Sequence, residues 1–166
     1  MSARRVAIYF AWVVLMAFFF AHVEIQIEGP AGWAAALPTW RIESHWLLDI
    51  FWGGRALTGY HAWAFSFMAL MFLSPLAFNG RWQAHDLLLA LAGLMVFWVA
   101  EDFLWFLLNP AFGWAHFDPA HVPWHKRWWW GAPVDYWGGL GGAALLLLAS
   151  RRFIGRTASG PASSGS

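Results

Sequence analysis

The chain has 166 residues, of which 60% are hydrophobic and only 11% charged, against about 25% charged in an average soluble domain. A soluble fold of this size could not bury that much apolar surface, so the composition excludes an ordinary water-soluble domain. The net charge of +1 and the lack of a basic patch exclude nucleic-acid binding, and the absence of Cys excludes disulfides, thiolate metal sites and iron–sulfur clusters.

Aromatic residues independently predict a membrane protein. They make up 20% of the chain and include 15 Trp. Trp and Tyr favour the membrane interface, where the apolar ring contacts lipid while its polar edge stays near water. The composition therefore predicts an all-α integral membrane protein whose first partner is the lipid bilayer.

The first predicted span covers residues 6–25, after Arg4 and Arg5. It has about the 20 residues that a helix needs to cross the hydrocarbon core. A signal peptide is the alternative, but the run is long for one, and no small-residue cleavage site follows before His22 and Glu24. We expect a retained helix.

Residues 29–56 are interrupted by Gly, Pro and charges and are not expected to cross the membrane. The apolar stretch from Trp46 to Trp52 predicts a short interfacial helix within them, capped by Ser44. The second and third spans follow at residues 57–78 and 87–108. Asn109-Pro110 ends the third, because proline disfavours the α conformation in the residue before it.

A second interfacial segment is expected between Pro110 and Asp135, because it is rich in Pro and Trp. The last span, residues 136–150, is short and Gly-rich, which permits close helix packing. The sequence therefore predicts a bundle of about four helices forming a single domain over residues 1–156, with two Trp-rich interfacial segments on the outer side. Residues 157–166 contain little to bury and are predicted to be a disordered tail.

Orientation follows from the Lys and Arg residues, which are enriched in cytoplasmic segments. In a four-span topology, six Arg fall on one side and crowd the helix ends: Arg4, Arg5, Arg81, Arg151, Arg152 and Arg156. Four basic residues fall on the other side: Arg41, Arg55, Lys126 and Arg127. This bias predicts both termini in the cytoplasm, and we expect a bacterial inner membrane.

The rare polar residues gather toward the outer leaflet in this topology. Glu101 and Asp102, about two turns before the end of their span, need partners, because a charge in hydrocarbon costs a few kcal/mol. Imidazole and carboxylate are ligands that Zn, Fe, Mn and Cu accept. The sequence therefore predicts a transition-metal site built from three to five of seven residues, namely His22, Glu24, His61, Glu101, Asp102, His121 and His125.

Spacing limits which of these residues bind together. His121 and His125 are four apart, which would put both rings on one helix face, although Pro123 lies between them. His22 and Glu24 point about 200° apart on a continuous helix, and Glu101 and Asp102 diverge by about 100°. At most one of His22 and Glu24 is then expected to bind, unless the helix has already ended. Of Glu101 and Asp102, one is expected to bind while the other supports a ligand or a neighbouring backbone.

Structural explanations stay open beside the metal site. Glu101 and Asp102 could pair with Arg55, Lys126 or Arg127 and fasten the outer segments to the bundle. His45, His85 and His116 are expected to be solvated or hydrogen-bonded, and His61 has the same alternative at its helix start. A haem or chlorin is disfavoured, because His22 and His61 lie near the membrane boundary rather than deep in the bundle.

Three functional hypotheses follow. The leading one is a membrane metalloprotein, with a metal-dependent activity on a lipid-like substrate and Glu101 as ligand or catalytic base. The alternative is an accessory subunit that packs against a second copy or another membrane protein, with its buried acids in ion pairs. A transporter is less favoured, because a path needs polar residues through the full depth of the membrane. The chain contains no sequence motif that names a catalytic class.

Overall fold

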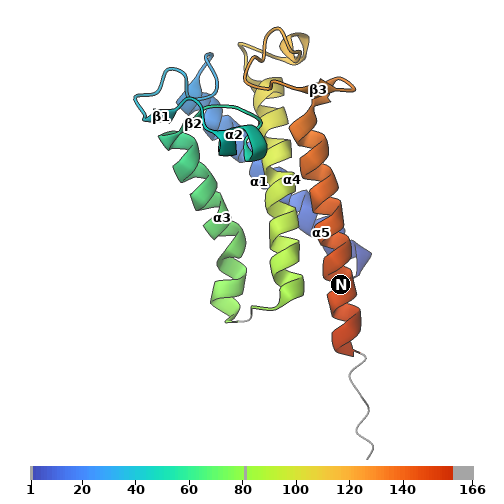
Figure 1. Ribbon diagram of the computed structural model, residues 1–166. Helices are drawn as coiled ribbons and strands as arrows, with labels where there is room; N and C mark the ends of the chain where they lie inside the picture. The colour runs from blue at the N-terminus through green and yellow to red at the C-terminus, as the bar shows by residue number, and fades with distance from the viewer. Residues whose placement is uncertain (1, 81, 159–166) are drawn as a thin grey trace, which may run out of the picture.

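The computed structural model describes residues 2–80 and 82–158, and over these residues the protein is mostly helical (Figure 1). Its α-helices are α1 (Ala3–Glu28), α2 (Trp46–Phe51), α3 (Gly59–Asn79), α4 (Ala84–Leu108) and α5 (Val134–Ala158). A 3-10 turn, η1, covers Trp114–His116. Two short antiparallel ladders pair β1 (Arg41–Ile42) with β2 (Leu57–Thr58) and β3 (Trp128–Trp129) with β4 (Ala132–Pro133).

Three of these helices, α1, α3 and α4, are long and apolar enough to cross a membrane, which indicates a membrane protein. They coincide with the first three predicted spans, and α1 extends three residues beyond its predicted span at each end. The fourth predicted span lies inside α5, which is not among the three in the part of the chain that the structure describes. The glycines of α5 and the arginines in its later part lower its mean hydropathy below that of the other three long helices.

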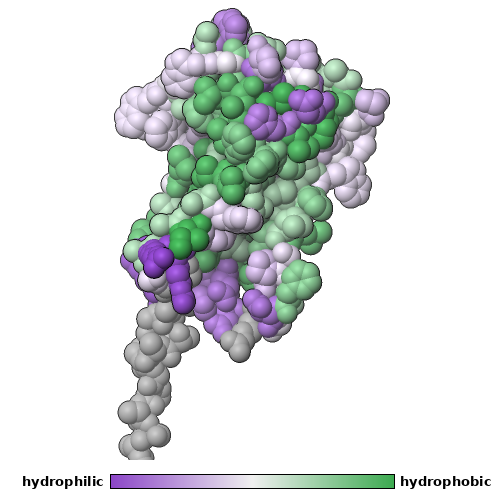
Figure 2. All heavy atoms as spheres, turned by 180° about the vertical axis from the view of Figure 1, so that it is seen from behind, coloured by the Kyte–Doolittle hydropathy of each residue, from purple (hydrophilic) through white to green (hydrophobic). Residues whose placement is uncertain are grey.

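Large apolar side chains cover the outside of the long helices. Trp12, Leu70 and Phe78 are 61%, 68% and 88% exposed. Figure 2 shows hydrophobic atoms over the middle of one face, with hydrophilic atoms gathered toward both ends. A protein with such a surface would aggregate in water. Lipid tails are as apolar as these side chains, so the same surface is stable in a membrane. The surface therefore agrees with the three candidate spans.

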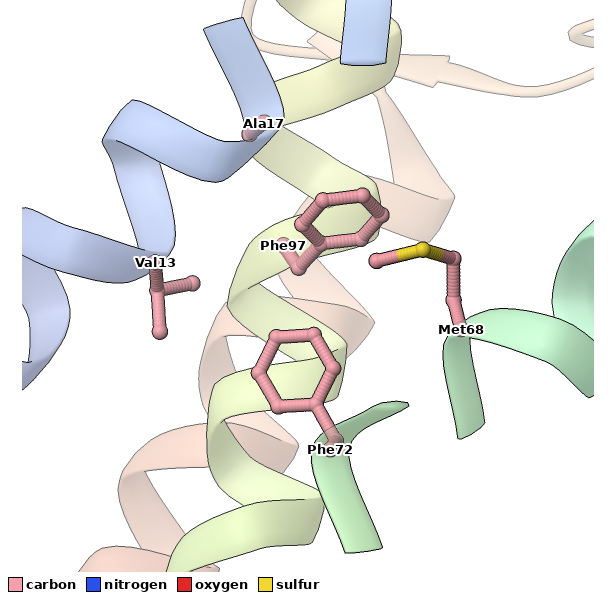
Figure 3. Close-up of a cluster of buried hydrophobic side chains, with 5 residues drawn as sticks. All are labelled: Val13, Ala17, Met68, Phe72 and Phe97. Atoms are coloured by element: carbon pink, nitrogen blue, oxygen red, sulfur yellow. The ribbon is translucent and has the colours of Figure 1, made fainter. Parts of the chain in front are cut away.

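The central helix is α4, because α1, α3 and α5 all pack against it. Phe97 of α4 is fully buried and lies between Val13 and Ala17 of α1 and Met68 and Phe72 of α3 (Figure 3). The small Ala17 lets the backbone of α1 approach the ring, and the complete burial of Phe97 stabilises this layer. This core fixes the helices on which the polar residues lie.

The first connecting segment contains the short helix that the sequence predicts, but its cap is different. Because α2 begins at Trp46, the N-cap is His45 rather than Ser44, and His45 Nδ1 accepts a hydrogen bond from the Leu47 amide at 3.2 Å. Pairing of β1 with β2 returns this segment to the start of α3.

The second connecting segment folds back onto the end of α4. Its Val122 is fully buried in a cluster with Trp105 and Phe106 of α4. The helix α4 ends at Leu108, as Asn109-Pro110 predicts, and the Asn109 side chain donates to the Gly29 carbonyl at 3.0 Å. This bond ties the ends of α1 and α4 together.

The predicted C-terminal tail is only partly described. The helix α5 continues to Ala158, and residues 159–166 lie outside the described residues.

Candidate functional site

A cavity of about 260 Å³ lies where α1, α3, α4 and α5 meet the two connecting segments. Its polar lining consists of Glu24, Glu28, Arg55, His61, Glu101, Asp102, His125, Asp135 and Tyr136. Its apolar lining includes Trp52, Phe65, Met95, Trp98 and Val99. A larger pocket of about 570 Å³ lies at the opposite ends of α1, α3 and α4, and among the described residues its lining includes a single acid, Asp86, and no histidine. The titratable groups therefore concentrate in the smaller cavity.

Three buried residues in this cavity bring their ligand atoms together. One carboxylate oxygen each from Glu24 and Glu28 and one ring nitrogen of His61 all lie within 4.8 Å of one another. Glu28 Oε1 is 3.7 Å from His61 Nε2. The two glutamates are four residues apart on α1, so they share the helix face that packs inward. All three residues are buried, and His61 is only 4% exposed.

Glu101 offers a fourth oxygen. It lies on the face of α4 that also carries Phe97 and Trp105, and it is 2% exposed. It lines the same cavity as Glu24, and its Oε1 atom is buried without a hydrogen-bond partner among the described residues. An unpartnered buried carboxylate oxygen is costly, and a bound proton or cation relieves that cost.

Hydrogen bonds from neighbouring residues orient these groups. Thr58, the N-cap of α3, lies 2.7 Å from His61 Nδ1, which leaves Nε2 directed toward the acids. Tyr60 donates to Glu24 Oε1 at 2.9 Å, and the Ala34 amide donates to Glu28 Oε1 at 2.5 Å. Metal-binding His and carboxylates in proteins are usually held by outer hydrogen bonds of this kind.

The loop after α1 reaches the site through two strained residues. Trp33 and Ala34 have φ of 45° and 51°, which is uncommon for residues other than Gly, Asn and Asp. This conformation places the Ala34 amide on Glu28 and stacks the Trp33 ring on His61, with centroids 4.0 Å apart. Strained backbone of this kind concentrates at functional sites, and here it positions two residues against the cluster.

A second group of charged residues fills the other side of the cavity. Asp102 Oδ2 lies 3.0 Å from His125 Nε2 and also accepts a hydrogen bond from Tyr136. Asp135 Oδ2 is 2.7 Å from Arg55 Nη2 and 3.5 Å from His125 Nδ1. Burial by itself lowers the pKa of His125, but the adjacent Asp102 and Asp135 outweigh it and hold that pKa above its ordinary value.

The two groups differ in charge balance. Asp102 and Asp135 lie against the Arg55 guanidinium and the His125 ring, so the second group becomes neutral as a whole when His125 is protonated. Glu24, Glu28 and Glu101 bring up to three negative charges, and among the described residues no ion pair joins any of them to Lys or Arg. Buried charge without a partner is strongly unfavourable, so a bound proton or cation would stabilise the first group more than the second.

Comparison with protein-family models, with curated proteins and with solved structures finds no match.

Five of the seven predicted ligands line the cavity, and two do not. His22 is exposed on α1 and contacts Phe18, with ring centroids 4.8 Å apart. His121 is exposed and is bonded to Asp118, so the structure does not bring it to His125, which is buried. The spacing of four between these two histidines does not place them together, because residues 117–127 form turns rather than a helix.

Sequence reasoning missed Glu28, which the structure places in the cluster. The predicted first span ended at residue 25, so Glu28 was expected outside the helix. The spacing of Glu24 and Glu28 by one helical turn is the signal that could have found it, provided that α1 is continued to its actual end. The supporting contacts of Thr58, Tyr60 and Ala34 carry no comparable signal in the sequence.

Proposed function

We propose that the protein is an integral membrane metalloprotein that binds one divalent transition metal ion through Glu24, Glu28, His61 and Glu101. In this proposal α1, α3, α4 and α5 form a four-helix membrane bundle, and the two Trp-rich connecting segments lie in the outer interface. Three carboxylates and one imidazole suit Zn, Fe or Mn better than a soft ion such as Cu(I).

The single observation that carries the proposal is the convergence of buried acids that pair with no Lys or Arg among the described residues. Three ligand atoms from Glu24, Glu28 and His61 lie within 4.8 Å, and Glu101 presents an unpartnered buried oxygen beside them. A metal ion would compensate the charge and supply that missing partner. The hydrogen bonds from Thr58, Tyr60 and Ala34 would hold the ligands in place.

The shape of the cavity favours a lipid-like substrate for a metal-dependent enzyme. Trp52, Phe65, Trp98 and Val99 line the cavity beside the acids, so an amphiphile could place its polar group at the acids and its apolar part against these side chains. A bound metal would supply Lewis acidity or activate water there. Glu101 would serve as a ligand or as a base.

The second candidate is a non-catalytic subunit of a membrane complex. The ion pairs of Asp102, His125, Asp135 and Arg55 favour it, because they fasten the second connecting segment to α4 and α5 without any need for chemistry. The exposed aromatic surface would then contact a partner protein or a second copy. A transporter remains the weakest candidate, because the cavity's acids and histidines lie at one end of the helices.

Metal analysis of wild-type protein beside matched variants tests the proposal. Protein purified without chelator should contain about one equivalent of transition metal by inductively coupled plasma mass spectrometry. Glu101→Gln and His61→Ala should each lose it, whereas His22→Ala, an exposed histidine outside the cavity, should retain it.

The stability of the same variants separates the two candidates. If the acids bind only protons, metal stays absent from wild type even after reconstitution, and Glu101→Gln raises the thermal stability by removing a buried acid. Metal-free wild type after reconstitution would contradict the metalloprotein proposal and direct the search toward partner proteins.

A further inference from the structure

Two histidines outside the cavity lie side by side on the second connecting segment. This segment joins α4 to α5 at the top of Figure 1. The rings of His116 and His121 have centroids 4.5 Å apart and are tilted by 51°. The side chain of His121 is half-exposed, at 50%. Neither residue lines the cavity that holds Glu101.

The hydrogen bonds of the two rings fix which nitrogen carries the proton. His116 Nδ1 is 2.7 Å from the Phe112 carbonyl oxygen, which can only accept, so Nδ1 must donate. His121 Nδ1 is 2.9 Å from an oxygen of Asp118. The hydrogen bond from His121 is the main cause that lowers the pKa of Asp118, so this carboxylate is ionised at neutral pH and also accepts. The neutral form of each ring therefore has its Nε2 lone pair free.

Local structure holds both rings in position. His116 ends the 3-10 turn η1, which begins after Gly113 with φ of +65°. Asp118 accepts hydrogen bonds from the amides of Ala120 and His121 at 2.8 Å and 3.2 Å, which stabilises the turn that carries His121. Between them Phe117 packs edge-on against Phe103, with ring centroids 5.5 Å apart.

We propose that His116 and His121 form a second metal site, a surface pair that takes a borderline divalent ion such as Zn²⁺ or Cu²⁺ through the two Nε2 atoms. Neutral imidazole suits these ions, and water would complete their coordination in this exposed place. A backbone carbonyl and a carboxylate on the opposite nitrogen are the supports that metal-binding histidines generally have. The pair does not depend on the metal proposed for the cavity, and a bound ion would link η1 to the turn at Asp118.

Titration of metal-stripped, detergent-purified protein with Cu²⁺ tests this site. The variant with Glu24→Gln and His61→Ala removes the cavity cluster and should still bind Cu²⁺ with an electron paramagnetic resonance spectrum showing two nitrogen ligands. Adding His116→Ala or His121→Ala to it should reduce the spectrum to one nitrogen. Each should also weaken binding by at least about tenfold, and Asp118→Ala should weaken it by about 10- to 100-fold through loss of the outer hydrogen bond.

Exposed histidines elsewhere provide the control. His22→Ala in the same background should leave the Cu²⁺ affinity and the two-nitrogen spectrum unchanged. If the His116→Ala, His121→Ala double variant binds Cu²⁺ as tightly as its parent and keeps two nitrogen ligands, the proposal is wrong. A circular dichroism spectrum that matches that of the parent protein establishes that each variant is folded. Loss of Cu²⁺ binding in a folded variant is then caused by the missing histidine.

Discussion

His125 links the second connecting segment to the long helices through charge. It is 4% exposed, and Asp102 of α4, Asp135 of α5, Arg55 and the Tyr136 hydroxyl surround it. Because Arg55 is positively charged and the two acids are negative, a protonated imidazole completes a neutral group. A buried ion pair adds little stability when intact, but removal of one partner leaves the others uncompensated.

The stability that His125 contributes should therefore depend on pH. Since Asp102 and Asp135 raise its folded pKa, the protonated ring stabilises the fold most below its unfolded pKa of about 6.5, and this contribution disappears as the pH rises through the folded pKa. Thermal unfolding of wild type and of His125→Gln can be compared in detergent with chelator. The difference in melting temperature between the two proteins should be largest near pH 5.5 and should shrink toward pH 8.5. A difference that widens as pH rises would contradict this assignment.

At the level of residues, the sequence predicts which polar side chains are buried better than it predicts which residues contact them. Glu101 and Asp102 were expected to need partners because they lie in an apolar span, and the structure gives them different surroundings on the two sides of the cavity. Their divergence of about 100° on a helix anticipates that separation. The contacts of Trp33 and Ala34 depend on left-handed backbone in a loop, which the sequence pattern does not encode.

The packing of α5 on α4 rests on glycines of one face. A Cβ atom at Gly139 would lie 2.6 Å from Val99 Cγ2, so only glycine fits there at the present helix separation. A Cβ atom at Gly141 would meet nothing within 4 Å. The Gly-rich sequence of this helix predicts close packing, but it does not distinguish the packed face from the open one.

Substitution at these two glycines should have opposite effects. Gly139→Ala should destabilise the protein, because the added methyl group forces α4 and α5 apart, at a cost of about 1–3 kcal/mol. Gly141→Ala should be neutral or stabilise by up to about 1 kcal/mol, because alanine favours the helix and the position is open. Thermal unfolding of the two variants in one detergent measures both effects. Equal losses would show that α5 does not pack on α4 through this face.

Long elements are predictable here because their lengths follow from the membrane, whereas their ends depend on capping. The spans 57–78 and 87–108 fall close to α3 and α4, and the end of α4 at Leu108 follows from Pro110. The sequence pattern does not predict the extension of α1 to Glu28, because two glutamates after an apolar run usually mark its end. Only the buried cavity on this side of α1 explains why the helix continues through them.

In the whole molecule, the acids and histidines of the cavity lie at one end of the long helices, where the connecting segments also carry Arg41, Arg55, Lys126 and Arg127. The connecting segments and the cavity lie at one end of the long helices, and the turn between α3 and α4 lies at the other (Figure 1). The exposed arginines Arg4 and Arg151 occupy the beginning of α1 and the later part of α5. Since basic residues at span ends favour the cytoplasm, this distribution supports the proposed orientation.

Single-cysteine labelling tests that orientation directly, because the natural chain contains no Cys. Glu43→Cys lies in the first connecting segment and Gln83→Cys in the turn before α4, and both positions are exposed. If the connecting segments face outward, a membrane-impermeant maleimide added to intact cells should label Glu43→Cys at once and Gln83→Cys only after permeabilisation. Labelling of Gln83→Cys alone in intact cells would reverse the orientation and place the cavity on the cytoplasmic side. Labelling of both without permeabilisation would exclude α3 as a span, because α3 separates the two positions.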